Sequence, residues 1–188
     1  MIRLAPRPVW ILLALITAAT ALASLVLTPW LDLDPCHLCI FERTLFMLLA
    51  LLATLTAALW RPDWRRFVAR ASALLFLALA ALGSGVAAYQ SWLQWQPVDT
   101  ISCIGGPPGP IERLVEWLGQ QMPALFLASG FCEDTELVIL GLSLANLAFV
   151  VFGAALAAGI WALWRGWRPS QEGLDRLPSA NKPERQNA

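Results

Sequence analysis

Two cysteines and a pair of charged residues lie close together in the stretch DPCHLCIFER, at the start of an apolar segment. Cys36 and Cys39 form a Cys-x-x-Cys pair, His37 lies between them, and Glu42 and Arg43 follow. A pair with this spacing closes a very small ring and removes little entropy from the unfolded chain, so it would be a poor structural crosslink. The spacing is more typical of a redox-active dithiol or of half a metal site.

The setting of the pair favours redox chemistry. Pro35 suits the first turn of a helix that begins near Cys36, where backbone N–H groups and the positive end of the helix dipole favour a thiolate. Zinc would need two further ligands, which Cys103 and Cys132 could supply, but such a closed site would leave the nearby arginine without a role. Haem attachment is excluded, because Ile40 stands where a histidine would have to follow the second cysteine.

Arg43 and His37 each have a functional and a structural interpretation. Arg43 follows Cys39 by four residues, so the two share a helix face, and an ionisable residue inside a membrane span marks a candidate functional site. It would hold the charge or carbonyl oxygen of a molecule that reacts with Cys39. Alternatively, Arg43 extends to the interface or pairs with Glu42 or Asp34. His37 either supports a thiolate when protonated or is a solvated interfacial residue.

The elements that must position these residues are four long apolar segments. The chain has 188 residues, of which 58% are hydrophobic and 14% are charged, whereas a soluble domain is about half apolar and one-quarter charged. About 20 helical residues cross the hydrocarbon core, and only a helix satisfies its own backbone there. We therefore expect an all-α membrane protein, a four-transmembrane-helix bundle, with spans at 9–27, 40–59, 68–93 and 137–163.

These spans form a single predicted domain, 1–165, followed by a polar tail, 166–188, that we expect to be disordered and cytoplasmic. The first span resembles a secretory signal in having Arg3 and Arg7 before its apolar run. Its apolar region is longer than the ~7–15 residues typical of such signals, so we expect it to be retained as a span.

The basic residues predict the orientation. Every Lys and Arg apart from Arg43 and Arg113 lies before the first span, between the second and third or at the start of the third (Arg70), or after the fourth. Both termini are therefore expected in the cytoplasm, with loops 28–35 and 94–136 facing outward. All four cysteines lie in these loops or at their edges. In a bacterial envelope this compartment is oxidising, so disulfides are expected, and two purely structural disulfides remain an alternative.

The second cysteine pair lies in the long outer loop. Cys103 precedes the turn-rich stretch IGGPPGP and is expected to be accessible, whereas Cys132 comes near the loop's end. Between them, IERLVEWLGQQ has an apolar helical face that includes Ile111 and Val115 and an opposite polar face. This pattern predicts a short amphipathic helix on the outer membrane surface. A disulfide that merely braces the loop is the alternative.

Together these features resemble the DsbB family, the quinone-linked thiol oxidases of the bacterial inner membrane. PCHLCIFER resembles that family's Pro-Cys-x-x-Cys-(x)2-Glu-Arg signature, and EWL…FLASGFCE is similar to the stretch that leads to its last essential cysteine. The resemblance covers residues 9–165. It implies a membrane disulfide oxidoreductase that reoxidises a periplasmic thioredoxin-like oxidase of the DsbA type and passes two electrons to a quinone.

The resemblance also implies roles for the four cysteines. A reduced partner attacks a Cys103–Cys132 disulfide, most readily at Cys103, and the released Cys132 attacks Cys36 to form a transient inter-loop bridge. Cys39 is left as a thiolate next to a bound quinone. Reoxidation of the Cys36–Cys39 pair then sends the electrons to the respiratory chain.

The quinone, ubiquinone or menaquinone, would contact Arg43 by the family pattern. Where the family often has a basic or polar residue near the end of the third span, this chain has Gln90, with Gln94 four residues later. A glutamine can hydrogen-bond a quinone carbonyl but brings no charge, so Gln90 is either a quinone contact or a polar helix-packing residue. No nucleotide-binding glycine motif offers another electron acceptor, and no nucleic-acid partner is expected.

Two rival functions use the same features. One is a non-enzymatic membrane scaffold with structural disulfides, which would resist mild dithiol treatment. The other is a vitamin K epoxide reductase-like enzyme, in which the active Cys-x-x-Cys would be expected on a later span rather than at the start of the second.

Overall fold

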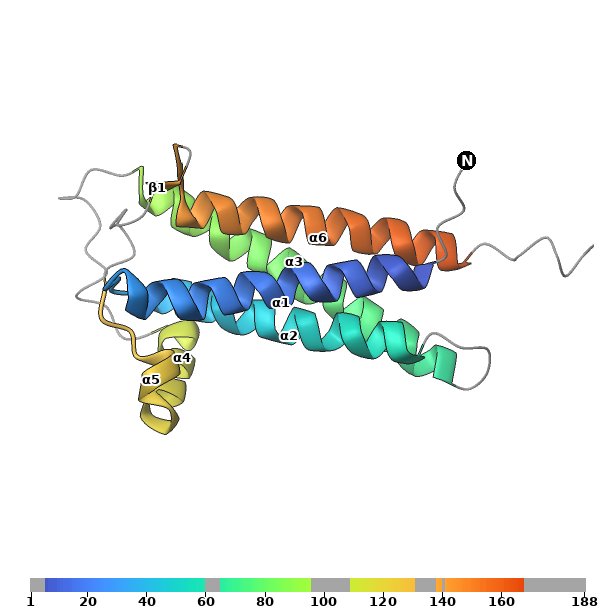
Figure 1. The fold of residues 1–188 in the computed structure, drawn as a ribbon, viewed down its shortest axis with the longest axis horizontal. Helices are drawn as coiled ribbons and strands as arrows, with labels where there is room; N and C mark the ends of the chain where they lie inside the picture. The colour runs from blue at the N-terminus through green and yellow to red at the C-terminus, as the bar shows by residue number, and fades with distance from the viewer. Residues whose placement is uncertain (1–5, 60–64, 96–108, 131–137, 140, 168–188) are drawn as a thin grey trace, which may run out of the picture.

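Four long helices form the body of the molecule. The computed structural model describes residues 6–59, 65–95, 109–130, 138–139 and 141–167. Within this part of the chain, four helices are long and apolar enough to cross a membrane, which confirms the predicted four-helix bundle. They are α1 (Pro6–Trp30), α2 (His37–Leu59), α3 (Arg65–Leu93) and α6 (Leu144–Trp167) (Figure 1).

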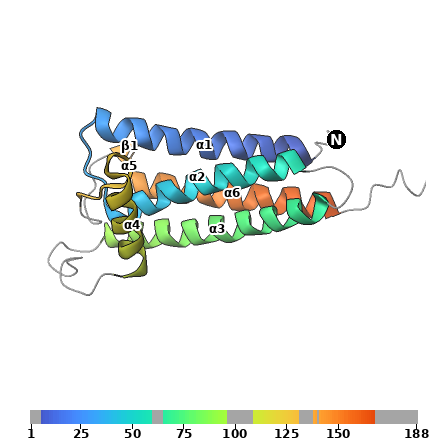
Figure 2. The same ribbon diagram turned by 90° about the horizontal axis from the view of Figure 1, so that it is seen from below.

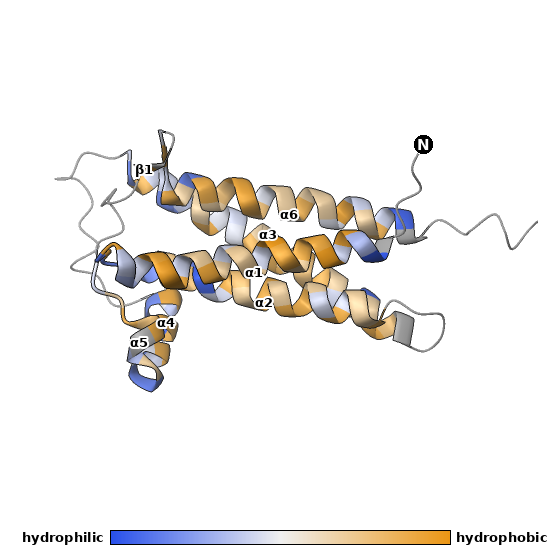
Figure 3. Ribbon diagram, in the orientation of Figure 1, coloured by the Kyte–Doolittle hydropathy of each residue, from blue (hydrophilic) through white to orange (hydrophobic). Residues whose placement is uncertain are grey.

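The four helices surround one core. Helix α1 packs against α2, α2 against α3, α3 against α6 and α6 against α1 (Figure 2). The rings of Phe46 and Phe152 stack with centroids 4.0 Å apart, and Trp10 meets Phe76 edge to face. Hydrophobic residues also cover the outside of the helices (Figure 3). Such an apolar exterior is unusual for a soluble protein but matches a surface covered by lipid.

Two short helices lie across one end of the bundle, where α2 begins and α3 ends (Figures 1 and 2). Helix α4 (Pro110–Gln121) begins with a proline in its first turn, and the Glu112 carboxylate accepts the Gly109 N–H at 2.6 Å. Helix α5 (Pro123–Phe126) follows directly. The expected amphipathic helix is therefore confirmed as α4.

The apolar face of α4 is shared between the protein and its surroundings. Val115 is 1% exposed and packs with Ile40 of α2 and Phe126 of α5, whereas Leu114 and Trp117 remain exposed. One part of the helix thus anchors it to the bundle. The exposed part is suited to a membrane surface.

The fourth long helix begins later than the expected span at 137–163. A short hairpin precedes it, formed by two strands of two residues each, β1 (Val138–Ile139) and β2 (Leu142–Ser143). Gly141 has a φ of +83°, a left-handed conformation that an α-helix cannot contain and that glycine adopts without steric cost. Helix α6 therefore starts only after this turn, and the Ser143 hydroxyl accepts the backbone N–H of Asn146 at 3.3 Å.

Two groups of sequence predictions lie outside the described residues. Cys103 and Cys132 both belong to the segments that the structure does not describe, and so does most of the tail 166–188. Helix α1 begins and α6 ends at the end of the bundle opposite α4 (Figure 1).

Candidate functional site

The Cys36–Cys39 pair lies at the first turn of α2. The Cys36 sulfur accepts the backbone N–H of Cys39 at 3.3 Å, and the Cys36 carbonyl accepts the N–H of Ile40 at 3.1 Å, so Cys36 caps the helix. The two sulfurs are 3.1 Å apart, well beyond the ~2.05 Å of a disulfide bond. The pair is therefore a dithiol held in near-bonding position. Cys36 is buried, and Cys39 is half-buried.

Gln90 connects the last turns of α3 to both sulfurs. Its side-chain Nε2 donates to Cys39 Sγ at 3.0 Å and lies 3.5 Å from Cys36 Sγ. The Gln90 side chain is 3% exposed, and its Oε1 has no hydrogen-bond partner among the described residues. An unmet buried acceptor is costly, which favours a bound molecule that can donate to it.

Arg43 lies one turn beyond Cys39 and is 5% exposed. Its Nε donates to Ser24 Oγ at 3.0 Å, and Nη2 donates to the Ser24 carbonyl and to the Thr28 hydroxyl, all on α1. Its Nη1 donates to the Leu125 carbonyl of α5 at 3.1 Å. Arg43 is thus buried rather than extended to the interface, and it connects α1, α2 and α5.

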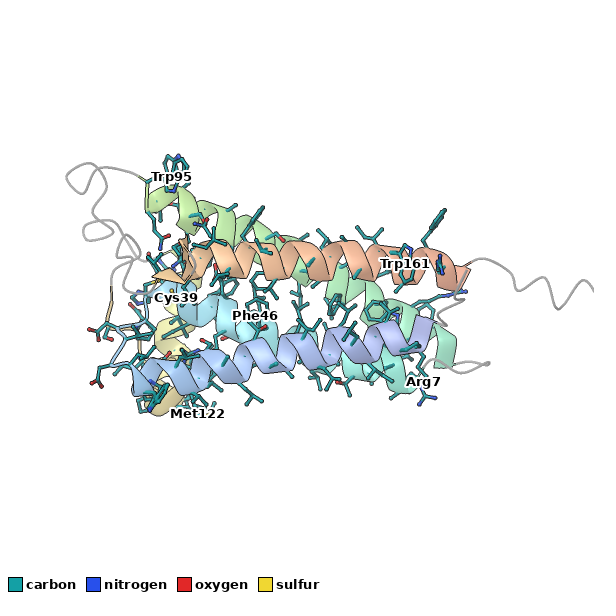
Figure 4. The ribbon with its side chains drawn as sticks, turned by 45° about the horizontal axis from the view of Figure 1, so that its top comes forward. Arg7, Cys39, Phe46, Trp95, Met122 and Trp161 are labelled. Carbon is teal, nitrogen blue, oxygen red and sulfur yellow. The ribbon has the colours of Figure 1, made fainter. Side chains whose placement is uncertain are left out.

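A cleft of about 430 Å³ brings these side chains together, a volume suited to a small organic molecule. Cys39, Arg43 and Gln90 all line it, and Glu42 and Phe46 extend its lining along α2. Figure 4 shows Cys39 at the same end of the bundle as Trp95 and Met122, with Phe46 further along α2. The remaining walls of the cleft come from small and apolar residues of α1 and α6, among them Ala19, Ala23, Ala145, Leu147 and Ala148.

His37 faces a different part of the structure. It lines a second pocket of about 270 Å³ with residues of α4 and α5, including Glu116 and Phe126, and it is absent from the lining of the Cys39 cleft. Its side chain is half-exposed. These observations favour the interpretation of His37 as an interfacial residue.

The chain just before Cys132 docks onto the chain just before Cys36. The backbone N–H groups of Ser129 and Gly130 both donate to the Pro35 carbonyl, at 3.1 and 3.3 Å. The Ser129 hydroxyl donates to Asp34 Oδ1 at 2.8 Å. The long outer loop is therefore held against the short one next to the dithiol.

Sequence reasoning did not identify several residues of this site. Ser24 looks like an ordinary small residue of the first span and Thr28 like one of the loop after it, and each becomes significant only because Arg43 reaches across from α2. Ser129 and Gly130 fall within the quoted FLASGFCE stretch, but nothing in that stretch indicates that they contact Pro35.

A dithiol that opens a membrane helix beside an apolar cleft defines the class of this protein as a membrane thiol–disulfide oxidoreductase. The family model for disulfide bond formation protein DsbB matches residues 6–162. The chain belongs to the DsbB family.

Curated relatives agree with this assignment, and each is named disulfide bond formation protein B. The protein from Dechloromonas aromatica is 40% identical over 152 residues, which cover 79% of this chain and 83% of the relative. The one from Albidiferax ferrireducens is 38% identical, covering 71% and 73%. The one from a Polaromonas species is 36% identical, covering 85% and 92%.

Family membership decides between the functions considered above. The protein is a multi-pass protein of the bacterial inner membrane and a quinone-linked disulfide oxidoreductase that forms disulfide bonds. It is neither a non-enzymatic scaffold nor a vitamin K epoxide reductase-like enzyme.

Proposed function

We propose that the protein reoxidises a periplasmic thioredoxin-like oxidase of the DsbA type and passes the two electrons through Cys36 and Cys39 to a quinone. The quinone would bind in the cleft that Cys39, Arg43 and Gln90 line. In this proposal both termini face the cytoplasm, and α4, α5 and the cysteines face the periplasm. The orientation is supported by the described basic residues at the start of α1, the start of α3 and the end of α6, helix ends that lie opposite α4.

The observation that carries this proposal is the meeting of Cys39, Gln90 and Arg43 in one cleft with apolar walls. A lipid-soluble quinone needs an apolar site, and a few convergent polar groups orient its ring. The buried Oε1 of Gln90 would accept a hydrogen bond from a ring hydroxyl of the quinol, the reduced form of the quinone. The residues present therefore fit a quinone, with either ubiquinone or menaquinone as the candidate.

Each side chain has a distinct part in this chemistry. When bound, the quinone supplies a two-electron, two-proton acceptor. The Cys36–Cys39 dithiol loses two electrons and two protons as its sulfurs join, and their 3.1 Å separation requires little movement. Gln90 Nε2 donates to the Cys39 sulfur and so favours its thiolate, the reactive form of a cysteine.

Arg43 contributes a positive charge, and its hydrogen bonds hold α1 and α5 in place beside the cleft. A guanidinium group has five N–H donors. Four of these bonds go to Ser24, Thr28 and Leu125, which leaves one Nη1 hydrogen without a partner in the described part of the chain. In our proposal this remaining donor and the charge act on a quinone oxygen, while the other bonds hold α1 and α5 in place.

The second cysteine pair completes the relay. The reduced partner attacks the Cys103–Cys132 disulfide at Cys103, and Cys132 then attacks Cys36 and releases Cys39 as a thiolate. This order rests on the family pattern. It is supported by the docking of Ser129 and Gly130 beside Cys36.

Turnover with a purified reduced DsbA-type partner and a soluble quinone analogue tests the proposal. We expect partner thiols to disappear and quinone to be reduced in equal two-electron amounts. Cys39→Ala should abolish turnover, whereas Thr54→Ala, at an exposed position of the same helix, should leave it unchanged. Equal turnover in Cys39→Ala, or quinone reduction without loss of partner thiols, would contradict it.

A further inference from the structure

The junction between the two outer loops is a specific contact rather than a general packing surface. A single carbonyl, that of Pro35, accepts two successive backbone N–H groups, from Ser129 at 3.1 Å and from Gly130 at 3.3 Å. The side chain of Ser129 adds a bond to Asp34 Oδ1 at 2.8 Å. Two adjacent residues of one loop thus engage two adjacent residues of the other.

Gly130 makes this contact possible. A Cβ atom added at this position would collide with the backbone carbonyl of Asp34. That neighbour is backbone, which cannot swing aside as the tip of a flexible side chain can. Any other residue at position 130 would therefore push the two loops apart.

The preceding part of the loop is held as well. The Leu125 carbonyl accepts from Arg43 at 3.1 Å, and Phe126 is buried with Ile40 and Val115. The segment from Leu125 to Gly130 is thus attached to α2 and to its N-terminal turn at several points. Among the described residues, the contact with Pro35 is the last of them before Cys132.

The contact limits the length of chain between the two cysteines. Pro35 directly precedes Cys36, and Cys132 follows Gly130 by two residues. Consecutive Cα atoms are about 3.8 Å apart, so two residues of chain reach no further than about 7.6 Å from Gly130. Only this short reach separates position 132 from the contact with Pro35.

We propose that Asp34, Ser129 and Gly130 form an inter-loop clamp, defined by these three residues and the Pro35 carbonyl, that positions Cys132 for attack on Cys36. This inference rests on the relay proposed above. In that step the Cys132 thiolate attacks Cys36 Sγ, the Cys36–Cys132 bond forms, the Cys36–Cys39 bond breaks, and Cys39 leaves as a thiolate. In this proposal the clamp residues neither form nor break a bond, and they act by raising the effective concentration of one cysteine at the other.

The effective concentration can be measured directly in a variant that retains only Cys36 and Cys132, made by Cys39→Ser and Cys103→Ser. Equilibration with reduced and oxidised glutathione, which supplies the oxidant, gives the fraction of protein with the inter-loop disulfide at each ratio. Adding Gly130→Ala should lower the effective concentration about tenfold or more, because small displacements of reacting groups are costly.

Gly85→Ala is the matched control. A Cβ atom at this exposed helical glycine meets nothing within 4 Å. In the Gly85→Ala variant, the effective concentration of Cys132 at Cys36 should equal that in the parent variant. An unchanged value in Gly130→Ala, or an equal loss in both glycine variants, would overturn the clamp.

A second set of substitutions does not depend on the folding of Gly130→Ala. Ser129→Ala and Asp34→Ala should each lower the effective concentration, and the double variant should be no worse than the more affected single one, because both remove the same hydrogen bond. Asp34→Asn should restore the value, since its amide oxygen also accepts. Fully additive losses, or no rescue by asparagine, would contradict the proposal.

The same experiment separates the clamp from the relay. If the parent variant forms no Cys36–Cys132 disulfide at any glutathione ratio, both the relay and the clamp are overturned. If the disulfide forms equally well in the parent and in all clamp variants, the relay stands and the clamp alone is wrong.

Discussion

The side-chain amide of Gln90 donates a hydrogen bond to the sulfur of Cys39 over 3.0 Å, from α3 to α2. The bond is made inside the bundle, since Gln90 is 3% exposed. A donor held against a buried sulfur stabilises the thiolate relative to the thiol. Gln90 therefore contacts the dithiol directly, in addition to its place in the lining of the cleft.

Gln90→Leu should slow quinone reduction. Replacing the amide removes a hydrogen bond to a charged group, worth about 1.5–3 kcal/mol, which corresponds to roughly 10–100-fold in rate at 1.4 kcal/mol per tenfold change. The measurement is the rate at which the reduced protein bleaches quinone absorbance. Tyr89→Phe, at the neighbouring exposed position, is the control. A normal rate in Gln90→Leu would mean that Gln90 is only a helix-packing residue.

Arg43→Ala should raise the apparent KM for quinone by about tenfold, because a charge-assisted hydrogen bond to the ring would be lost. Arg43→Lys keeps the charge but cannot reproduce the bonds to Ser24, Thr28 and Leu125. Its KM should lie between those of the wild type and the alanine variant. The exposed Arg7→Ala is the control.

The same two variants should loosen the outer loop. Hydrogen exchange of backbone amides in α5 should become faster in both, since Leu125 loses its partner on α2. An unaltered KM together with faster exchange would mean that Arg43 holds the loop and does not contact quinone.

Gly83→Ala should destabilise the bundle. A Cβ atom at this position would lie 2.5 Å from the ring of Phe152, which stacks on Phe46. Overpacking of this kind costs about 1–3 kcal/mol. Gly85→Ala, two residues along the same helix and facing open space, should be neutral or slightly stabilising. Unfolding in detergent compares them, and equal stability of the two variants would refute the packing argument.

The amino-acid sequence predicts the main elements well, because their signals are local. Four apolar stretches give the four long helices, and the spacing of Ile111 and Val115 gives α4. The start of α6 is predicted less well. Apolar residues continue through the hairpin before it, so hydropathy does not distinguish strand from helix there, and the break depends on the backbone of Gly141.

The site, like the fold, has features that the sequence predicts and features that it does not. The four-residue spacing predicts that Arg43 and Cys39 share a face of α2, and both line the cleft. The acceptors of Arg43 and the contact between Ser129 and Pro35 join segments far apart in the chain. Such contacts depend on how whole elements dock, and no local pattern encodes them. The roles of the four cysteines, Arg43 and Gln90 remain predictions for the experiments above.

Electron transfer from Cys39 to quinone is the step on which the proposed function depends most. Single-turnover stopped-flow mixing of the reduced protein with excess quinone tests it directly, with Cys103→Ala and Cys132→Ala removing the second pair. We predict loss of both remaining thiols with reduction of one equivalent of quinone, as two-electron chemistry requires, and no reduction when Cys39→Ala is added. Quinone reduction at an unchanged rate without Cys39, or without loss of the Cys36 and Cys39 thiols, would contradict the account.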